Sequence, residues 1–261
     1  MAFFMSNQRR TKIKDYIDNR GEATVAELLS LCGGCSNMTL WRDLKQLEEE
    51  GSIRRTRGGA ISLRLIQPDT EGLYIRRSRE NIHAKRAIAR AAVKHITSGH
   101  AIFFDAGSTV MELARLLTDE HFTVITSGAN IAIELSQLRS CNAICVGGQL
   151  SANTLSFSGP HADAFINSIN IDTAVMATSG FSLKHGFTSG SFTEHELKRS
   201  VITKAEKVIM LMDASKMQRN LPFTFATLAD IDILITDKPL PPDVMEKCLQ
   251  SNVKVIVADA E

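Results

Sequence analysis

The stretch Ser36-Asn-Met-Thr-Leu-Trp-Arg-Asp-Leu-Lys-Gln-Leu47 decides the fold of the N-terminal part of the chain. Leu40, Leu44 and Leu47 recur at the spacing of one helix face, which indicates a helix packed on a core. Ser36 immediately precedes the first turn and is a favourable N-cap residue. We therefore predict that this segment is an amphipathic helix whose opposite face is free for another task.

The residues before this segment predict two more helices. Residues 6–20 have apolar side chains at helical spacing and end at Gly21, and a second helix opens at Thr24. Glu27 lies three residues after Thr24, which is the pattern of a capping box. Gly33-Gly34 then separates the second helix from the third, so these two helices are joined by a tight turn.

Residues 52–65 follow the third helix as two short strand-like runs around Arg57-Gly58-Gly59, which is a hairpin signal. Three helices followed by a hairpin define a winged helix-turn-helix domain, which we assign to residues 1–65. In that fold the third helix enters the major groove of DNA. Arg42 is the best candidate for reading a base, since its guanidinium can pair with guanine. The simpler reading of each arginine is surface solubility. The residues expected at DNA are Ser36, Asn37, Met38, Thr39, Trp41, Arg42 and Lys45 of the helix, and Arg54, Arg55 and Arg57 of the wing.

Residues 66–261 are predicted to form a second, α/β domain. It begins with a basic bridging helix at about 75–97, after which apolar strand-like runs alternate with helical stretches. Near-continuous apolar strands separated by helices indicate a mainly parallel sheet covered on both faces. The predicted strands are 101–104, 123–125, 143–146, 173–177, 208–212, 231–235 and 254–257, and the predicted helices are 108–117, 129–138, 193–205 and 242–251.

Polar and glycine residues follow several of these strands. Because ligands of open parallel sheets bind beyond the carboxyl ends of the strands, we expect a pocket for a polyol phosphate there. Ser and Thr cap helices everywhere and Gly ends strands everywhere, so the clustering of these positions carries the prediction. The candidate ligand-binding residues are Asp105, Gly107, Ser108, Thr109, Ser127, Gly147, Gly148, Gly186, Asp213 and Lys216.

The charge of the chain is divided between its two halves. The 261 residues have a net charge of +1, but residues 1–94 hold 18 Lys and Arg against 11 Asp and Glu. Residues 95–261 hold 12 against 18. A basic N-terminal half fits a nucleic-acid partner, although the bridging helix supplies part of the excess. No apolar run approaches the roughly 20 residues of a membrane helix, and no signal peptide is evident, so we expect a cytoplasmic protein without a membrane partner.

Cys32-Gly-Gly-Cys35 is the one cysteine pair with a recognised spacing. A CxxC pair can bind zinc or act in redox chemistry, but a structural zinc site needs four ligands and none follows at a suitable spacing. We expect the pair to be small apolar residues around a glycine turn, and we expect no metal and no cofactor. A redox regulator that uses Cys32 and Cys35 is a third, weaker hypothesis.

The sequence contains no G-x-S-x-G, P-loop, H-E-x-x-H or G-x-G-x-x-G motif. Asp105, Asp213 and Lys216 have the chemistry for acid–base work on a sugar phosphate. Glu194 and Glu196 are expected on a helix surface. We therefore expect a sensor of a small ligand and not an enzyme. The alternative is a sugar-phosphate isomerase-like enzyme with an accessory DNA-binding head.

The motifs together resemble the DeoR-type bacterial transcriptional regulators over nearly the whole chain. Residues 36–51 are similar to the recognition-helix signature of that family, and residues 53–60 to its wing. In the bridge, Arg77, Asn81 and Lys85 fall on the R-x3-N-x3-K pattern of the family. The matching motifs of the second domain are Asp105–Thr109, Gly147-Gly148, Gly186–Thr188, Lys198-Arg199 and Asp213–Lys216.

The resemblance implies a sensor domain related in fold to ribose-5-phosphate isomerase, with a phosphorylated sugar as effector. It adds Lys85 to the candidate effector residues. It also implies a homodimer or homotetramer that acts mainly as a repressor of a sugar-catabolic operon by binding double-stranded operator DNA. The chain departs from the family pattern at Trp41, Arg57 and Ser127, and segment 28–35 is one residue longer than usual. Operator and ligand identity do not follow from the resemblance.

Overall fold

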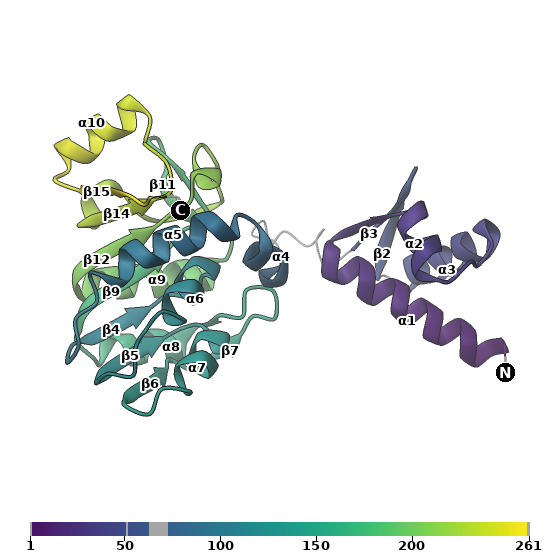
Figure 1. Cartoon of the computed structure of the whole chain (residues 1–261), viewed down its shortest axis with the longest axis horizontal. Helices are drawn as coiled ribbons and strands as arrows, with labels where there is room; N and C mark the ends of the chain where they lie inside the picture. The colour runs from purple at the N-terminus through teal and green to yellow at the C-terminus, as the bar shows by residue number, and fades with distance from the viewer. Residues whose placement is uncertain (1, 51, 63–72, 260–261) are drawn as a thin grey trace. The chain divides into compact units, whose positions relative to one another are not determined.

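The computed structural model describes residues 2–50, 52–62 and 73–259, which form two compact units. We call Met1–Arg76 the head and Arg77–Glu261 the sheet unit. Both are drawn in Figure 1. The boundary expected between residues 65 and 66 lies outside the described residues. Among the described residues, no helix combines the length and apolar character that a membrane span requires.

The head contains the three predicted helices, α1 (Ala2–Arg20), α2 (Val25–Leu31) and α3 (Asn37–Glu49). Both predicted N-caps are present. Thr24 and Glu27 form a complete capping box, and the Ser36 hydroxyl accepts a hydrogen bond from the amide of Thr39. Because these caps satisfy amide groups that have no partner inside the helix, they fix where α2 and α3 begin.

The wing is a three-stranded sheet and not a simple hairpin. The predicted hairpin is β2 (Ile53–Thr56) and β3 (Gly59–Ser62), and β1 (Glu22–Thr24) pairs with the other edge of β3. A Cβ atom on Gly59 would lie 1.9 Å from the carbonyl oxygen of Ala23. Only glycine therefore allows β1 to approach β3 in this register.

The core of the head is apolar and assembled from every element of the domain. The three leucines of α3 and both isoleucines of α1 are fully or almost fully buried, as their spacing predicts. This core holds the two helices of the helix-turn-helix and the wing in one body. Its buried residues are Ile13, Ile17, Ala23, Leu28, Leu40, Leu44, Leu47, Ile53 and Ala60.

The predicted single bridging helix at 75–97 is wrong. The chain forms α4 (Tyr74–Arg79) and α5 (Ile82–Val93), and it breaks between them at Asn81, whose φ of 52° and ψ of 36° are left-handed. Asparagine tolerates this conformation better than most residues. The Nζ atom of Lys85 donates to the carbonyl oxygens of Arg77 and Glu80 at the end of α4. The carbonyl groups at the break between the two helices thus receive their hydrogen bonds from the side chain of Lys85 in the first turn of α5.

The sheet unit is built on a seven-stranded sheet in the order β15-β14-β12-β9-β4-β5-β6. Every neighbouring pair is parallel, so all seven carboxyl ends lie at one edge, as predicted. The strand positions agree with the predictions, with shifts of a few residues at some ends. The strands are β4 (Ala101–Phe104), β5 (Phe122–Thr126), β6 (Cys141–Cys145), β9 (Ile171–Ala177), β12 (Ala205–Leu211), β14 (Ile233–Thr236) and β15 (Lys254–Val257).

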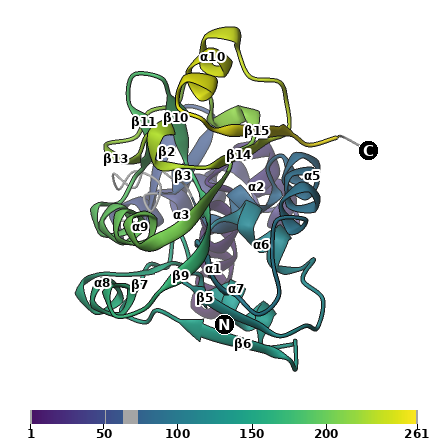
Figure 2. The ribbon, with the colours of Figure 1, turned by 90° about the vertical axis from the view of Figure 1, so that its left-hand side faces the viewer.

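Helices cover both faces of this sheet (Figure 2). Side chains alternate between the faces along each strand, so that Phe103 enters one core while Ile102 and Phe104 enter the other. One face packs against α5, α6 (Ser108–Ala114) and α7 (Ala129–Leu135). The other face packs against α8 (Pro160–Asn167), α9 (Phe192–Lys204) and α10 (Pro242–Gln250).

Several short elements of the sheet unit are absent from the sequence prediction. They are the hairpin of β7 (Gln149–Leu150) and β8 (Phe157–Ser158), helix α8, and a small antiparallel sheet. That sheet contains β10 (Gly180–Ser182), β11 (Gly186–Ser189) and β13 (Phe223–Ala226). Two 3-10 turns, Ala214–Lys216 and Leu228–Asp230, complete the unit.

We predict that Gly59→Ala destabilises the head by about 3 kcal/mol, because the added methyl group overlaps the Ala23 carbonyl and forces β1 away. Gly58→Ala is the matched control, since no atom lies within 4 Å of its Cβ position. Trp41 is the single tryptophan and contacts the core of the head, so its fluorescence during urea unfolding reports this unit. Equal unfolding midpoints for the two variants would contradict the close approach of β1 and β3.

Candidate effector site and DNA-binding surface

The free face of α3 carries most of the residues predicted to meet DNA. Asn37, Met38, Arg42 and Lys45 are exposed, and Met38 reaches 85% exposure. Met38 adds one apolar side chain to this otherwise polar face. The structure therefore brings these four side chains to one surface of the helix-turn-helix.

Ser36, Thr39 and Trp41, which were also predicted to meet DNA, make contacts within the head. Ser36 and Thr39 bond to each other, with 2.9 Å between their hydroxyl oxygens and 3.2 Å from the Thr39 amide to the Ser36 oxygen. Trp41 is half-buried and packs against the core of the head. Trp41 was expected on the free face with Arg42, but its indole packs partly against the core.

The three wing arginines differ from one another. Arg55 is held by Glu48, with a 2.6 Å ion pair from its Nε atom and a 2.8 Å hydrogen bond from its amide. These two hydrogen bonds lower the pKa of the Glu48 carboxyl. Arg54 and Arg57 are exposed. Arg55 thus joins the wing to α3, whereas Arg54 and Arg57 are free to point toward a partner.

An ion pair that the sequence did not suggest fixes the recognition helix. The Nε atom of Arg9 in α1 lies 2.6 Å from the Oδ2 atom of Asp43, whose side chain is only 5% exposed. The thiols of Cys32 and Cys35 contact each other near this pair, and burial raises the pKa of Cys32 to about 11. Both cysteines pack against the core of the head. No group of three or more metal-binding side chains occurs among the described residues.

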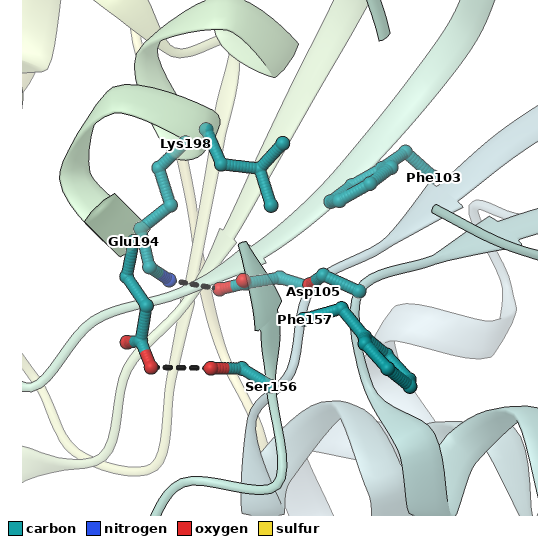
Figure 3. Close-up of a pocket in the computed structure, with 8 residues that line it drawn as sticks. Phe103, Asp105, Ser156, Phe157, Glu194 and Lys198 are labelled. Carbon is teal, nitrogen blue, oxygen red and sulfur yellow. Dashed lines mark hydrogen bonds and ion pairs between the residues drawn. The ribbon is translucent and has the colours of Figure 1, made fainter. Parts of the chain in front are cut away.

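A small cavity lies at the carboxyl edge of the large sheet (Figure 3). It follows the ends of β4 and β5, and α9 and the β7–β8 segment close it. Its volume is about 10 Å³, which is room for about one water molecule. The lining residues are Phe103, Asp105, Ser127, Ser156, Phe157, Glu194, Leu197 and Lys198. Asp105 and Ser127 were predicted from the sequence, and the others were not.

Asp105 and Lys198 form a buried ion pair across this cavity, with side-chain exposures of 4% and 10%. The same Asp105 oxygen, Oδ2, accepts a 2.9 Å hydrogen bond from the amide of Ala177, and the Lys198 Nζ atom donates to the Ala177 carbonyl at 2.9 Å. The pair therefore joins the ends of β4 and β9 to α9. Lys198 was noticed only as part of a family motif, and its pairing with Asp105 spans 93 positions of sequence.

Glu194 is the functional candidate that sequence reasoning misplaced. It was expected on a helix surface, but it is 6% exposed and its Oε1 atom accepts hydrogen bonds from Thr154 and Ser156. The Thr154 hydroxyl lies 2.5 Å away. Glu194 and Lys198 are four residues apart and so share one face of α9. That spacing was the available signal, whereas Glu196 on the other face is exposed as expected.

A second polar cluster surrounds Asp213, at the carboxyl end of β12. Its Oδ1 atom accepts from the amide of Ser215 at 3.0 Å and from Asn81 at 3.3 Å. Its Oδ2 atom is buried and has no hydrogen-bond partner among the described residues. Burial lowers the pKa of Lys216, an effect that the Asp213 charge opposes. A buried acceptor with unused capacity next to a desolvated ammonium group is an arrangement suited to a polar ligand.

Lys85 belongs to this cluster in a way the sequence did not indicate. Its Nζ atom is held by the two carbonyl groups of α4, and the side chain is 2% exposed. Burial lowers its pKa to about 8, and the neighbouring Asp213 partly offsets this. Lys85 thus places a readily titrated charge beside Asp213 while it also ends α4.

The remaining predicted effector residues divide into two groups. Ser108 and Thr109 are buried in the first turn of α6, and Gly107 and Gly148 permit close backbone approaches. Gly147 has a left-handed φ of 70° at the start of the β7–β8 segment. Gly186 lies in the turn of the β10–β11 hairpin, where a Cβ atom would meet the Ala226 carbonyl at 2.3 Å. It lines a separate cleft and not the cavity of Asp105, and its role in effector binding stays a prediction.

A winged helix-turn-helix with a free recognition face, followed by a parallel α/β unit with buried polar sites at one sheet edge, defines a ligand-responsive regulator of transcription. The family description "DeoR-like helix-turn-helix domain" matches residues 9–64, and "DeoR C terminal sensor domain" matches residues 80–238. The chain belongs to the DeoR family of DNA-binding transcriptional regulators. This confirms the family and the function class that the sequence motifs indicated.

Relatives with assigned names match over almost the full chain. The HTH-type transcriptional regulator GlpR of Haloferax volcanii is 33% identical over 95% of this chain and 96% of that protein. The regulator YulB of Bacillus subtilis, which is itself described as uncharacterized, is 32% identical over 95% of both chains. A putative aga operon transcriptional repressor of Escherichia coli O157:H7 is 30% identical over 97% of this chain and 94% of that protein.

Solved structures with similar folds were also found. Ribose-5-phosphate isomerase from Methanocaldococcus jannaschii has a TM-score of 0.40 and 17% identity, over 53% of this chain and 55% of that chain. The translation initiation factor eIF-2B of Pyrococcus horikoshii has a TM-score of 0.45 and 17% identity, over 83% and 81%.

We predict that Lys198→Met destabilises the sheet unit by about 3 to 5 kcal/mol, because it leaves the buried Asp105 carboxylate without its counter-charge. Arg199→Met is the matched control, since Arg199 is adjacent and exposed, and it should change stability by about 0.5 kcal/mol or less. Urea unfolding followed by far-ultraviolet circular dichroism measures the effect. A Lys198→Met unfolding curve that coincides with that of Arg199→Met would contradict the role of the pair.

Proposed function

We propose that the sheet unit binds a phosphorylated sugar at the carboxyl edge of its sheet, and that binding controls the affinity of the head for operator DNA. The observation that carries this proposal is the cluster around Asp213. It combines a buried carboxylate oxygen without a partner among the described residues with two desolvated lysines, Lys85 and Lys216. An anionic ligand would favour the charged form of both lysines, whose burial now opposes that form.

The phosphate end of the ligand is assigned to this cluster. The charge of Lys216 acts on Lys85, and the charge of Arg77 acts on both lysines, so positive charge is concentrated there. The Asp213 charge is the strongest single charge effect on both lysines and favours their charged forms, and Glu80 acts in the same direction. A phosphate dianion would relieve the repulsion among these cations. The Asp213 Oδ2 atom is then available to a hydroxyl group of the same ligand.

The sugar end is assigned to the cavity of Asp105. The carboxylates of Asp105 and Glu194 and the hydroxyls of Ser127 and Ser156 are the kinds of groups that bind sugar hydroxyls. β4 and β12 are separated by β9 alone, so their ends are about 10 Å apart. That span suits one phosphorylated sugar, with its two ends in the two clusters. The cavity must widen for this, because about 10 Å³ does not hold a sugar ring.

We further propose that the protein is a repressor and acts as a homodimer or homotetramer in the cytoplasm, where operator DNA is found. The name of the aga operon relative supports the role as a repressor. The homo-oligomer is supported by the general observation that helix-turn-helix dimers bind two half-sites of DNA. An enzyme of the isomerase class is the alternative. It is less favoured because a general base must take up a proton, and the ion pair with Lys198 favours the charged form of Asp105, as the hydrogen bonds from Thr154 and Ser156 favour that of Glu194. Accepting a hydrogen bond from a sugar hydroxyl needs no such proton transfer. Turnover of pentose phosphates by the full chain would favour the enzyme over the regulator.

We expect Arg42→Ala to weaken binding to operator DNA by about 5- to 150-fold, the usual cost of removing one side chain that reads a base. Arg55→Ala is the control, because the Arg55 guanidinium is already engaged by Glu48 and should contribute less. Binding is measured by mobility shift on a duplex selected from a random library by the full chain. An unchanged affinity for Arg42→Ala would rule out the assigned reading face.

A panel of phosphorylated sugars should contain one that raises the melting temperature of the sheet unit by about 5 °C or more at 100 times its Kd. Lys216→Met should abolish that shift, because it removes a charge from the phosphate end. Lys247→Met, an exposed lysine of α10, should leave it unchanged. A full shift in Lys216→Met would show that the ligand binds elsewhere.

The affinity for that phosphorylated sugar should fall as the pH rises above about 8. The pKa of Lys85 is lowered to about 8, so its charge is lost in this range, whereas the phosphate stays dianionic above its second pKa of about 6. One lost proton weakens binding by at most tenfold per pH unit. Lys216, with its lowered pKa, acts in the same direction. Calorimetric titration from pH 7 to 9.5 tests this, and Lys85→Met should show a flatter profile.

A further inference from the structure

One side of α5 carries a row of basic residues that the proposed effector site does not use. His83, Arg86, Arg90 and Lys94 are exposed and follow one another at intervals of three or four residues. The opposite side of α5 is buried against the sheet (Figure 1). This spacing makes the four side chains a single stripe on the helix surface. We call these four residues the basic stripe.

Two adjoining clefts lie beside the basic stripe, between α5 and β15. Their volumes are about 340 and 510 Å³, and both include Ala87, Arg90 and Ala258 in their walls. Ala84, Ala87 and Ala91 line these clefts, and their small side chains let a partner approach the helix backbone. β15 is an edge strand of the seven-stranded sheet.

The C-terminal end of the basic stripe, at Lys94, lies in a region of positive charge. The pKa of His95 is lowered by burial and by the charges of Lys207, Lys254 and Lys94, and within the described part of the chain no carboxylate is found to oppose this effect. Arg90 and Lys94 make no ion pair with any described residue, whereas Arg86 pairs with Glu112 at 3.0 Å. The carboxylates that line the clefts, Asp237 and Asp259, stand on the β14 and β15 side.

The extent of the stripe favours a polyanion over a small ligand. Arg86 and Lys94 are eight residues apart on one helix, which is about 12 Å. Lys207 is the third residue of β12 and Lys254 begins β15, so both lie at the edge of the sheet opposite the proposed effector site. Asp232 lies at the same strand starts, where its carboxylate accepts a hydrogen bond from the amide of Val208. Successive charges at this scale match a row of phosphates better than one phosphate group.

We propose that Arg90 and Lys94 contact the phosphate backbone of the same DNA duplex that the head reads. The protein binds DNA through its family-defined head, and head and sheet unit are parts of one chain, so DNA held by the head is at high effective concentration for the sheet unit. Residues 95–261 have six more acidic than basic residues, so their net charge disfavours binding to DNA. The basic stripe is the side of the sheet unit that attracts it.

Phosphate-backbone binding of this kind adds affinity without sequence specificity, and it releases counterions. The double variant Arg90→Ala, Lys94→Ala should reduce the slope of log affinity against log salt concentration by about 2, since each neutralised phosphate accounts for about 0.9 of the slope. Its base preference in selection from a random duplex library should stay unchanged. The test uses the full chain and two duplexes: the selected operator alone, and the operator extended by about 21 base pairs on each side, two helical turns.

The matched control neutralises two exposed lysines elsewhere on the sheet unit, Lys184→Ala, Lys247→Ala, and should leave the slope unchanged on both duplexes. A reduced slope for the α5 variant on either duplex supports the proposal, and the affected duplex shows where along the DNA the stripe binds. Equal slopes for wild type and the α5 variant on both duplexes overturn it. A charge-reversed variant, Arg90→Glu, Lys94→Glu, repeats the test and should lower the slope further if the stripe binds DNA.

Discussion

The ion pair between Asp105 and Lys198 is the constraint on which the sheet unit depends. It places two charges in a setting that is almost closed to water, where neither is tolerated without the other. The pair therefore fixes α9 against the ends of β4 and β9. Through Glu194, one turn earlier, it also fixes the β7–β8 segment. The ion pair thus holds together the elements that form the walls of the cavity.

The sequence predicts the head almost completely, because its signals are local. The capping residues of α2 and α3, the glycine turn and the leucine spacing act within a few positions, and the structure contains them all. The sequence misses β1, whose pairing with β3 depends on the absence of a side chain at Gly59. In the sheet unit, the burial of Glu194 also depends on contacts between distant parts of the sequence. A helical glutamate is usually exposed, and the hydrogen-bond partners of Glu194 are about 40 positions away.

The bridging segment shows how a basic run can serve separate purposes. A regular periodicity suggests one helix over 75–97, yet Asn81 adopts a left-handed conformation and Lys85 turns inward to meet the carbonyl groups of α4. The inward lysine is desolvated and lies beside Asp213. The arginines and lysine on the outer side of α5 remain in solvent. The charge pattern of the sequence does not distinguish the buried Lys85 from the exposed basic residues, because the sheet beneath the helix decides which side is buried.

The near-neutral total of +1 therefore conceals a spatial order. Positive charge is gathered on the wing and at Arg42, in the desolvated cluster around Lys85 and Lys216, and along the outer side of α5. The first and third are exposed, so counterions can leave them when a polyanion binds, while the second is desolvated and responds to a single anion. If both proposals hold, DNA and a phosphorylated ligand would meet positive charge in different dielectric settings and would not compete for it. α5 carries residues of both kinds, Lys85 in the desolvated cluster and Arg90 in the basic stripe.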